Sequence, residues 1–188
     1  ILDIEKIESG KLELNLQDVA VKDLVKEAVR QNEAFAQSHN AELTLNSETT
    51  DAVIHVDPDR MMQVLTNLMA NAAKFTGKDG KIDVLIKNDN DTISIAVKDN
   101  GPGIPPDKLS KIFDHFTQVD ASDKRAQQGT GLGLAISKAI VDALGGRLDV
   151  ESEVGVGSTF TVHVKRSLSS ASANNTSIDK NTVMREHG

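Results

Sequence analysis

The chain contains no cysteine, so it can form neither a disulfide framework nor a thiolate metal site. It has no apolar run near the ~20 residues that cross a bilayer, and it does not open on a signal-peptide pattern. It also lacks a basic block, and its formal net charge is −7. These absences argue against a membrane-spanning segment and against a nucleic-acid-binding surface. We therefore expect a cytoplasmic fragment that makes no contact with a membrane.

The length and composition of the chain fit one folded domain flanked by two short terminal segments. A length of 188 residues with 38% hydrophobic content is enough for a sizeable core, expected over residues 11–166. Residues 1–10 carry isoleucines at three-residue intervals and finish on a glycine, which indicates the end of a helix. Residues 167–188 are nearly free of apolar side chains, which predicts a linker or a disordered tail. Because the chain starts without methionine inside a helical pattern, we expect it to be a piece of a longer protein.

Hydrophobic periodicity predicts an α/β fold, since both helical spacing and strand alternation occur along the chain. The expected helices cover residues 21–38, 59–76, 107–113 and 131–144, and Asp57 with Pro58 fits the start of the second one. The expected strands cover residues 11–16, 42–46, 53–56, 82–87, 93–98, 148–151 and 159–164. Most of these strands form antiparallel pairs. We therefore expect a two-layer α/β (α+β) sandwich, in which helices cover one face of a mixed, largely antiparallel sheet.

The helix expected at residues 59–76 carries a polar stripe. Gln63, Asn67 and Asn71 lie on one side at helical spacing, with Lys74 one turn further on, while the other sides are apolar. An asparagine oxygen is a neutral, hard ligand that suits Mg²⁺, and a lysine suits a phosphate. The alternative is that these amides are solvated, as amides on an exposed helix face usually are.

A second motif is the sequence DNGPGI at residues 99–104, which follows a predicted strand. The carboxylate of Asp99 is suited to accept a hydrogen bond from an exocyclic amine. Gly101 and Gly103 permit backbone angles that are closed to other residues and let a planar ligand approach. The alternative is a turn between a strand and a loop, which explains the same residue types without a ligand.

A third motif is the sequence GTGLG at residues 129–133, which opens a predicted helix. Free amide donors at the N-terminus of a helix favour an anion. A flexible loop is the commoner meaning of such a pattern when it stands alone. No predicted strand leads directly into it, which argues against a dinucleotide-binding fingerprint.

These motifs, with the sequence IFDHF at residues 112–116, occur in a fixed order with globular spacing. Together they resemble the nucleotide-binding domain of sensor histidine kinases, within the GHKL superfamily that also holds gyrase, Hsp90 and MutL. The resemblance covers about residues 1–166 and implies a Bergerat-type ATP-binding fold. It also implies that residues 1–10 are the end of a dimerisation helix that precedes the catalytic domain.

The resemblance assigns roles near the base and near the terminal phosphate. It implies that Asp99 hydrogen-bonds the adenine amino group and that Thr159 reaches the same base through water, although Thr159 also fits an ordinary strand residue. The polar segment 117–128 resembles a mobile lid, tethered at one end by Phe113 and Phe116. Its Arg125 would meet the terminal phosphate, although a cation in a solvated loop is common. Ala126, Gln127 and Gln128 depart from the family's usual residues before the glycine-rich loop.

The resemblance also implies a complete set of site residues. Catalytic roles fall to Asn67, Lys74 and Arg125, and the metal ligands would be Asn71 and Asn67. The implied nucleotide-binding residues are Asn67, Asn71, Lys74, Asp99, Gly101, Gly103, Ile104, Phe116, Gly129, Thr130, Gly131, Leu132, Gly133 and Thr159.

A reaction and a set of partners follow from the same resemblance. The domain would bind ATP or ADP with Mg²⁺ and donate the γ-phosphate to a histidine on a dimerisation domain of the same protein, which this chain lacks. A response regulator or a receiver domain would be the next partner, and in hybrid members a linker like 167–188 leads to that receiver. We expect the fragment alone to be a monomer. No histidine of the chain has the sequence context of a phospho-acceptor: His39, His55, His115, His163 and His187.

Two other functions compete with a kinase. Conformational ATPases of the gyrase or Hsp90 kind carry a glutamate as general base one turn before the metal-binding asparagine, and Asn67 stands there in this chain. The other alternative is an inactive nucleotide-binding module. It ranks last, because every motif is intact.

Overall fold

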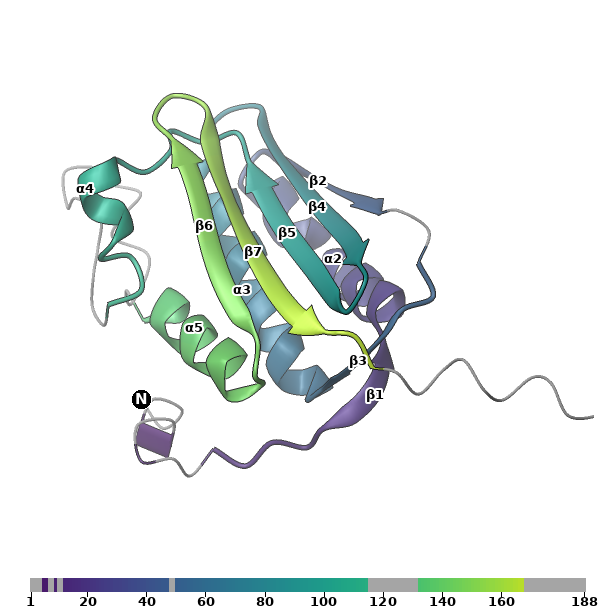
Figure 1. Ribbon diagram of the computed structural model, residues 1–188. Helices are drawn as coiled ribbons and strands as arrows, with labels where there is room; N and C mark the ends of the chain where they lie inside the picture. Colours follow the sequence, from purple (N-terminus) through teal and green to yellow (C-terminus); the bar gives the residue numbers. More distant parts are fainter. Residues whose placement is uncertain (1–4, 7–8, 10–11, 48–49, 115–131, 168–188) are drawn as a thin grey trace, which may run out of the picture.

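The computed structural model describes residues 5–6, 9, 12–47, 50–114 and 132–167. The domain has two layers, a five-stranded sheet and three helices that cover one of its faces (Figure 1). The strands, in spatial order, are β2 (Ala41–Ser47), β4 (Gly80–Asp89), β5 (Thr92–Asp99), β7 (Gly157–Lys165) and β6 (Arg147–Glu153). The covering helices are α2 (Val21–Ser38), α3 (Pro58–Phe75) and α5 (Gly133–Ala143), and a short α4 spans Pro106–Leu109. The strands β1 (Gln17–Ala20) and β3 (Val53–Val56) form a separate antiparallel ribbon.

The sheet is mixed because β2 runs parallel to β4, while the other neighbouring strands are antiparallel. Its strands bury alternate residues. In β5, Ile93, Ile95 and Val97 are buried against the helices, and the intervening Ser94 and Lys98 lie on the opposite, open face. The hydrophobic core therefore lies between the sheet and the helix layer.

Helix α3 begins where the sequence predicts. The Asp57 carboxylate accepts hydrogen bonds from the backbone N–H of Asp59 at 3.0 Å and of Arg60 at 3.1 Å, as a helix cap does. Its other oxygen accepts from the Asn15 backbone N–H at 2.9 Å. Burial acts to raise the pKa of Asp57, but these three backbone donors, helped by the charge of Arg60, leave that pKa below its ordinary value. The carboxylate thus joins the start of α3 to the preceding chain.

The strand expected at residues 11–16 is wrong. Residues 12–16 are extended but lie outside any strand, and β1 starts only at Gln17. The Asn15 N–H is bound by the Asp57 carboxylate instead of by a neighbouring strand, and Leu16 is exposed. Alternating leucines alone therefore do not predict a strand, because a strand also needs a neighbouring strand with which to pair.

The other elements agree with the sequence-based expectations, with smaller corrections. Helices α2 and α3 and the remaining strands fall within two residues of their expected bounds. The helix expected at 107–113 is helical only to Leu109, and α5 starts at Gly133. The predicted ends of the chain, 1–10 and 167–188, lie outside the described residues apart from residues 5–6, 9 and 167. In the described part of the chain, no helix is both long and apolar enough to cross a bilayer.

Candidate functional site

Asp99 lies at the end of β5 and is 7% exposed. Its Oδ1 accepts hydrogen bonds from the backbone N–H of Gly101 at 2.9 Å and of Ser158 at 3.4 Å. Burial raises the pKa of Asp99, and the two N–H donors offset only part of that rise. Oδ2 accepts no hydrogen bond from any of the described residues. The carboxylate is therefore held by one oxygen, and the other has no hydrogen-bond partner among the described residues.

The two glycines of the loop after β5 allow it to pack against its own backbone. A Cβ on Gly101 would lie 2.8 Å from Asp99 Oδ1 and 3.1 Å from the Phe75 carbonyl oxygen at the end of α3. Gly103 has a φ of +73°, and a Cβ there would overlap the carbonyl oxygen of Glu153 in β6. The glycines thus bring the loop into contact with both α3 and the β6–β7 hairpin.

Ser152 of β6 joins this loop to the hairpin. Its Oγ accepts from the Ile104 backbone N–H at 2.7 Å, donates to the Gly157 carbonyl at 3.0 Å and lies 2.8 Å from Ser158 Oγ. A further backbone bond runs from the Gly155 N–H to the Pro102 carbonyl at 2.8 Å. The loop at residues 100–104 is therefore fixed on the hairpin through both side chains and backbone.

The strand register corrects the expectation for Thr159. Asp99 pairs with Ser158 across β5 and β7, whereas Thr159 pairs with Lys98 on the open face of the sheet. Thr159 therefore points away from Asp99, and Ser158 lies where Thr159 was expected. Sequence reasoning missed Ser158 and Ser152. Counting by two from the apolar positions Phe160, Val162 and Val164 would have placed Ser158 on the covered face.

The amide stripe of α3 divides into two parts. Asn67 Nδ2 donates to Ser137 Oγ of α5 at 2.9 Å, so this amide is engaged by the neighbouring helix. Asn71 and Lys74 are half-buried, and neither makes a side-chain hydrogen bond or ion pair within the part of the chain that the structure describes. Gln63 accepts from Arg60 Nη1 at 2.9 Å. Asn71 and Lys74 are therefore the stripe residues that remain open to a ligand.

Helix α5 presents its N-terminus beside Asn67. Its N-cap, Leu132, makes no side-chain capping bond, so the first-turn N–H groups of α5 have no side-chain cap. Five other expected site residues lie outside the described residues: Phe116, Arg125, Gly129, Thr130 and Gly131. The same holds for the expected lid at 117–128, so these roles stay predictions.

The donor set suits Mg²⁺ better than a transition metal. Among the described residues, no group of three or more histidine, aspartate or glutamate side chains could hold a metal ion. The site offers neutral amide oxygens instead. Mg²⁺ keeps several waters and is bound largely through substrate phosphates, so one or two protein oxygens fit it.

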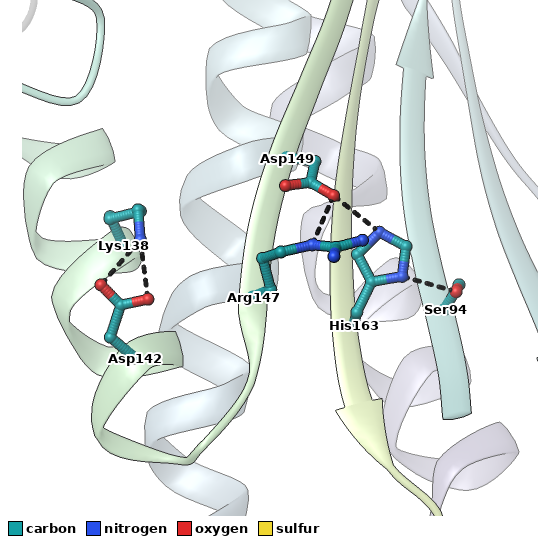
Figure 2. Close-up of polar contacts among 6 residues, drawn as sticks. All are labelled: Ser94, Lys138, Asp142, Arg147, Asp149 and His163. Atoms are coloured by element: carbon teal, nitrogen blue, oxygen red, sulfur yellow. Dashed lines mark hydrogen bonds and ion pairs between the residues drawn. The ribbon is translucent and has the colours of Figure 1, made fainter. Parts of the chain in front are cut away.

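The three described histidines make local contacts. On the open face, His163 Nδ1 lies 2.9 Å from Ser94 Oγ and Nε2 lies 3.2 Å from Asp149 Oδ2, and Arg147 Nε donates to the same oxygen at 2.7 Å (Figure 2). His55 pairs with an aspartate of β1, and His39 contacts the preceding turn of α2. These contacts agree with packing or surface roles.

The parts of the site come together at one end of the domain. Asp99 at the end of β5, the tip of the β6–β7 hairpin and the end of α3 lie at the same end of the sheet (Figure 1). From there the stripe of α3 leads along Asn71 to Asn67 and the start of α5. The arrangement offers a buried acceptor at one end and the N-terminus of α5 at the other. Between them, α3 carries Lys74 in its last turn, next to Phe75, and then Asn71 and Asn67 toward α5.

Residues 56–168 match the family described as "Histidine kinase-, DNA gyrase B-, and HSP90-like ATPase". The chain belongs to this family. It is 36% identical over 166 residues to the circadian input-output histidine kinase CikA of Synechococcus elongatus, covering 87% of this chain and 22% of that protein. It is 38% identical over 175 residues to the signal transduction histidine-protein kinase BarA of Escherichia coli K12, covering 89% and 19%. The chain thus spans about a fifth of the length of these relatives.

A solved structure has the same architecture. Full-length ShkA in complex with AMPPNP superposes with a TM-score of 0.79 at 27% identity, covering 90% of this chain and 35% of that one. The family and the two-layer fold expected from the sequence are therefore confirmed.

Proposed function

We propose that this domain binds Mg²⁺-ATP and donates its γ-phosphate to a histidine of a dimerisation domain outside this chain. The observation that carries the proposal is Asp99, a buried carboxylate held through Oδ1 that keeps Oδ2 for an exocyclic amine. The names of the relatives CikA and BarA and the AMPPNP bound to ShkA support it. The reaction would take place in the cytoplasm, with a response regulator or receiver domain as the next partner.

The residues of the chain divide the work between base and phosphates. Asp99 accepts from the adenine amino group, and Lys74 neutralises phosphate charge. Asn71 supplies an amide oxygen toward Mg²⁺, together with Asn67 one turn earlier on α3. The Mg²⁺ ion would neutralise the charge that develops on the phosphates. The first-turn N–H groups of α5 donate to phosphate oxygens. In this site, catalysis rests on positioning and charge neutralisation.

A kinase fits this site better than an ATPase because of Asn67. At neutral pH an amide cannot take a proton from water, so hydrolysis lacks general-base assistance typically worth ~10²–10⁴-fold. In addition, Asn67 Nδ2 is bound to Ser137. The phosphate therefore has to pass to an acceptor that another domain supplies.

Calorimetry with ATP and GTP tests the assignment of the base pocket. We expect Asp99→Asn to weaken ATP binding about ten- to a hundred-fold, because a charged hydrogen bond is worth roughly 1.5–3 kcal/mol. The matched control is Asp83→Asn on β4, whose carboxylate also accepts two hydrogen bonds, in this case from the side chains of Thr44 and Asn46. Equal ATP affinity of Asp99→Asn and the wild type, or a preference for GTP, would contradict the assignment.

Transfer of label tests the reaction. The chain is incubated with γ-labelled ATP, first alone and then with a matching helical domain that carries the acceptor histidine. We expect label on the acceptor only. Stable label on the chain itself, or rapid phosphate release without the acceptor, would identify a different activity.

A further inference from the structure

Three residues join α3 to α5: Asn67, Gly133 and Ser137, here named the clamp. Asn67 Nδ2 donates to Ser137 Oγ at 2.9 Å across 70 residues of sequence. One turn earlier on α5, the Cα of Gly133 faces the same amide, and a Cβ there would overlap Asn67 Oδ1 and lie 2.9 Å from Cγ. The two polar atoms of the Asn67 amide thus contact the first two turns of α5, Oδ1 at Gly133 and Nδ2 at Ser137.

The clamp limits the separation of the two helices in both directions. If α5 moved away from α3, the hydrogen bond between Asn67 and Ser137 would break. If α5 moved closer, the Asn67 amide would collide with the backbone of Gly133, which is already too near to accept a methyl group. A hydrogen bond and a steric contact together therefore hold the start of α5 at one distance from α3.

Ser137 is an unusual residue for its place in α5. It is 2% exposed and lies among the buried apolar residues Ala135, Ile140 and Val141. Alanine would favour the helix more, and a buried hydroxyl without a partner is unfavourable. The hydrogen bond from Asn67 satisfies this hydroxyl, so the serine at this position is explained by the clamp and not by the helix.

Asn67 and Asn71 lie on the same stripe of α3, but their surroundings differ. Asn67 is engaged by α5, whereas Asn71, one turn further along α3, has no side-chain hydrogen bond within the described chain. We infer that Ser137 is a positioning residue for the phosphate half of the site. Through Asn67 it sets the first turn of α5 against Asn71 and Lys74. This inference rests on the nucleotide function proposed above.

The inference predicts a split between the two halves of a nucleotide. Adenosine reports on the base half at Asp99, and AMPPNP with Mg²⁺ reports on both halves. Because Ser137→Ala removes the hydrogen bond to Asn67, we expect it to weaken AMPPNP binding about three- to ten-fold. Adenosine affinity should stay within about two-fold of the wild type, because the hydrogen bonds around Asp99 do not involve α5. Retained adenosine binding also shows that the variant is folded.

A double-mutant cycle tests whether Ser137 acts through Asn67. AMPPNP and adenosine affinities are measured by titration for the 188-residue chain and for Ser137→Ala, Asn67→Ala and the double variant. If the hydroxyl acts through the amide, Ser137→Ala has no further effect on AMPPNP once Asn67 is alanine. The matched control is Ser94→Ala, since Ser94 also has a side-chain partner but lies on the open face (Figure 2). It should bind both ligands like the wild type.

Three results would overturn the inference. These are unchanged AMPPNP affinity in Ser137→Ala, equal losses for adenosine and AMPPNP, and additive effects in the cycle. Failure of the nucleotide function itself looks different, because the wild-type chain would then bind neither ligand.

Discussion

The two halves of the proposed nucleotide site differ in how the fold holds their polar groups. At the base half, backbone N–H groups and two serine hydroxyls fix Asp99 and its loop, with Ser152 and Ser158 at the centre of the network. At the phosphate half, Asn71 and Lys74 are side chains with no hydrogen bond to other described residues, and only Asn67 is fixed. The proposed base half is therefore fixed by contacts of the fold itself. The proposed phosphate half depends on side chains that the fold holds less tightly.

The comparison predicts that damage to the base half also damages the fold. The largest effect is expected for Gly103→Ala, because φ is +73° there and the new Cβ would overlap the Glu153 carbonyl. Backbone strain and overpacking together predict a loss of about 2–4 kcal/mol in the free energy of unfolding. Urea denaturation measures it, and adenosine binding should fall in parallel.

Gly155 provides the matched control for Gly103. Its φ is +82°, but a Cβ there would meet nothing within 4 Å, so Gly155→Ala carries only the backbone strain. We expect it to lose about 1 kcal/mol. Equal losses in the two variants would mean that the contact between the loop and the hairpin contributes nothing.

A smaller effect is expected for Ser152→Ala, which leaves the Ile104 N–H and the Ser158 hydroxyl without their partner. Unsatisfied groups of this kind cost about 1–3 kcal/mol of stability. Because the loop loosens beneath the base, adenosine and AMPPNP should lose affinity by the same factor. A loss confined to AMPPNP would place Ser152 in the other half of the site and would break the comparison.

Lys74→Ala gives the opposite pattern. Lys74 has no hydrogen bond or ion pair within the described chain, so its removal should leave the free energy of unfolding within about 0.5 kcal/mol of the wild type. AMPPNP should bind about ten-fold more weakly, as for one charge-assisted contact, and adenosine should bind unchanged. Lys87→Ala on β4 is the control. A clear loss of stability in Lys74→Ala would show that the phosphate half also supports the fold.

The same difference explains what the sequence could predict. Helices α2 and α3 were predicted almost to the residue, because each buries one continuous face and periodicity is a local signal. Asp99 and the glycines could be proposed as site residues for a similar reason, since a motif of six neighbouring residues carries them. Thr159 was expected to reach the base, but it pairs with Lys98 and Ser158 pairs with Asp99, a difference that strand alternation could have indicated.

Long-range contacts were beyond such reasoning. The difference between Asn67 and Asn71 depends on Ser137, which lies on another helix 70 residues away from Asn67. Likewise, the alternating leucines at 12–16 do not tell whether a partner strand exists, and the structure pairs the Asn15 N–H with a carboxylate. Pairing across the chain is set by packing, which no local pattern reports.

The smallest predicted effect compares two buried aspartates, Asp57, which caps a helix, and Asp99, which we propose binds the base. The pKa of Asp57 is lowered in the folded state, so its contribution to stability is present above the unfolded value of 3.8 and is lost as the pH falls through the folded pKa. The pKa of Asp99 is raised by burial, so the folded state holds its proton more tightly than the unfolded chain. Its contribution is present below 3.8 and is lost as the pH rises through the folded pKa.

The asparagine variants of these two residues should therefore respond to pH in opposite directions. Relative to the wild type, Asp57→Asn should be less stable at pH 7, and the difference should shrink as the pH falls toward and below 3.8. Asp99→Asn should gain relative stability as the pH rises from 3.8 through the raised folded pKa, because an uncharged amide avoids the desolvation of a buried carboxylate. Urea denaturation between pH 3 and 7 measures both. If Asp99→Asn instead lost relative stability with rising pH, as Asp57→Asn does, the Asp99 carboxylate would stabilise the fold. The pH dependence would then give no support to a ligand-binding role for its second oxygen.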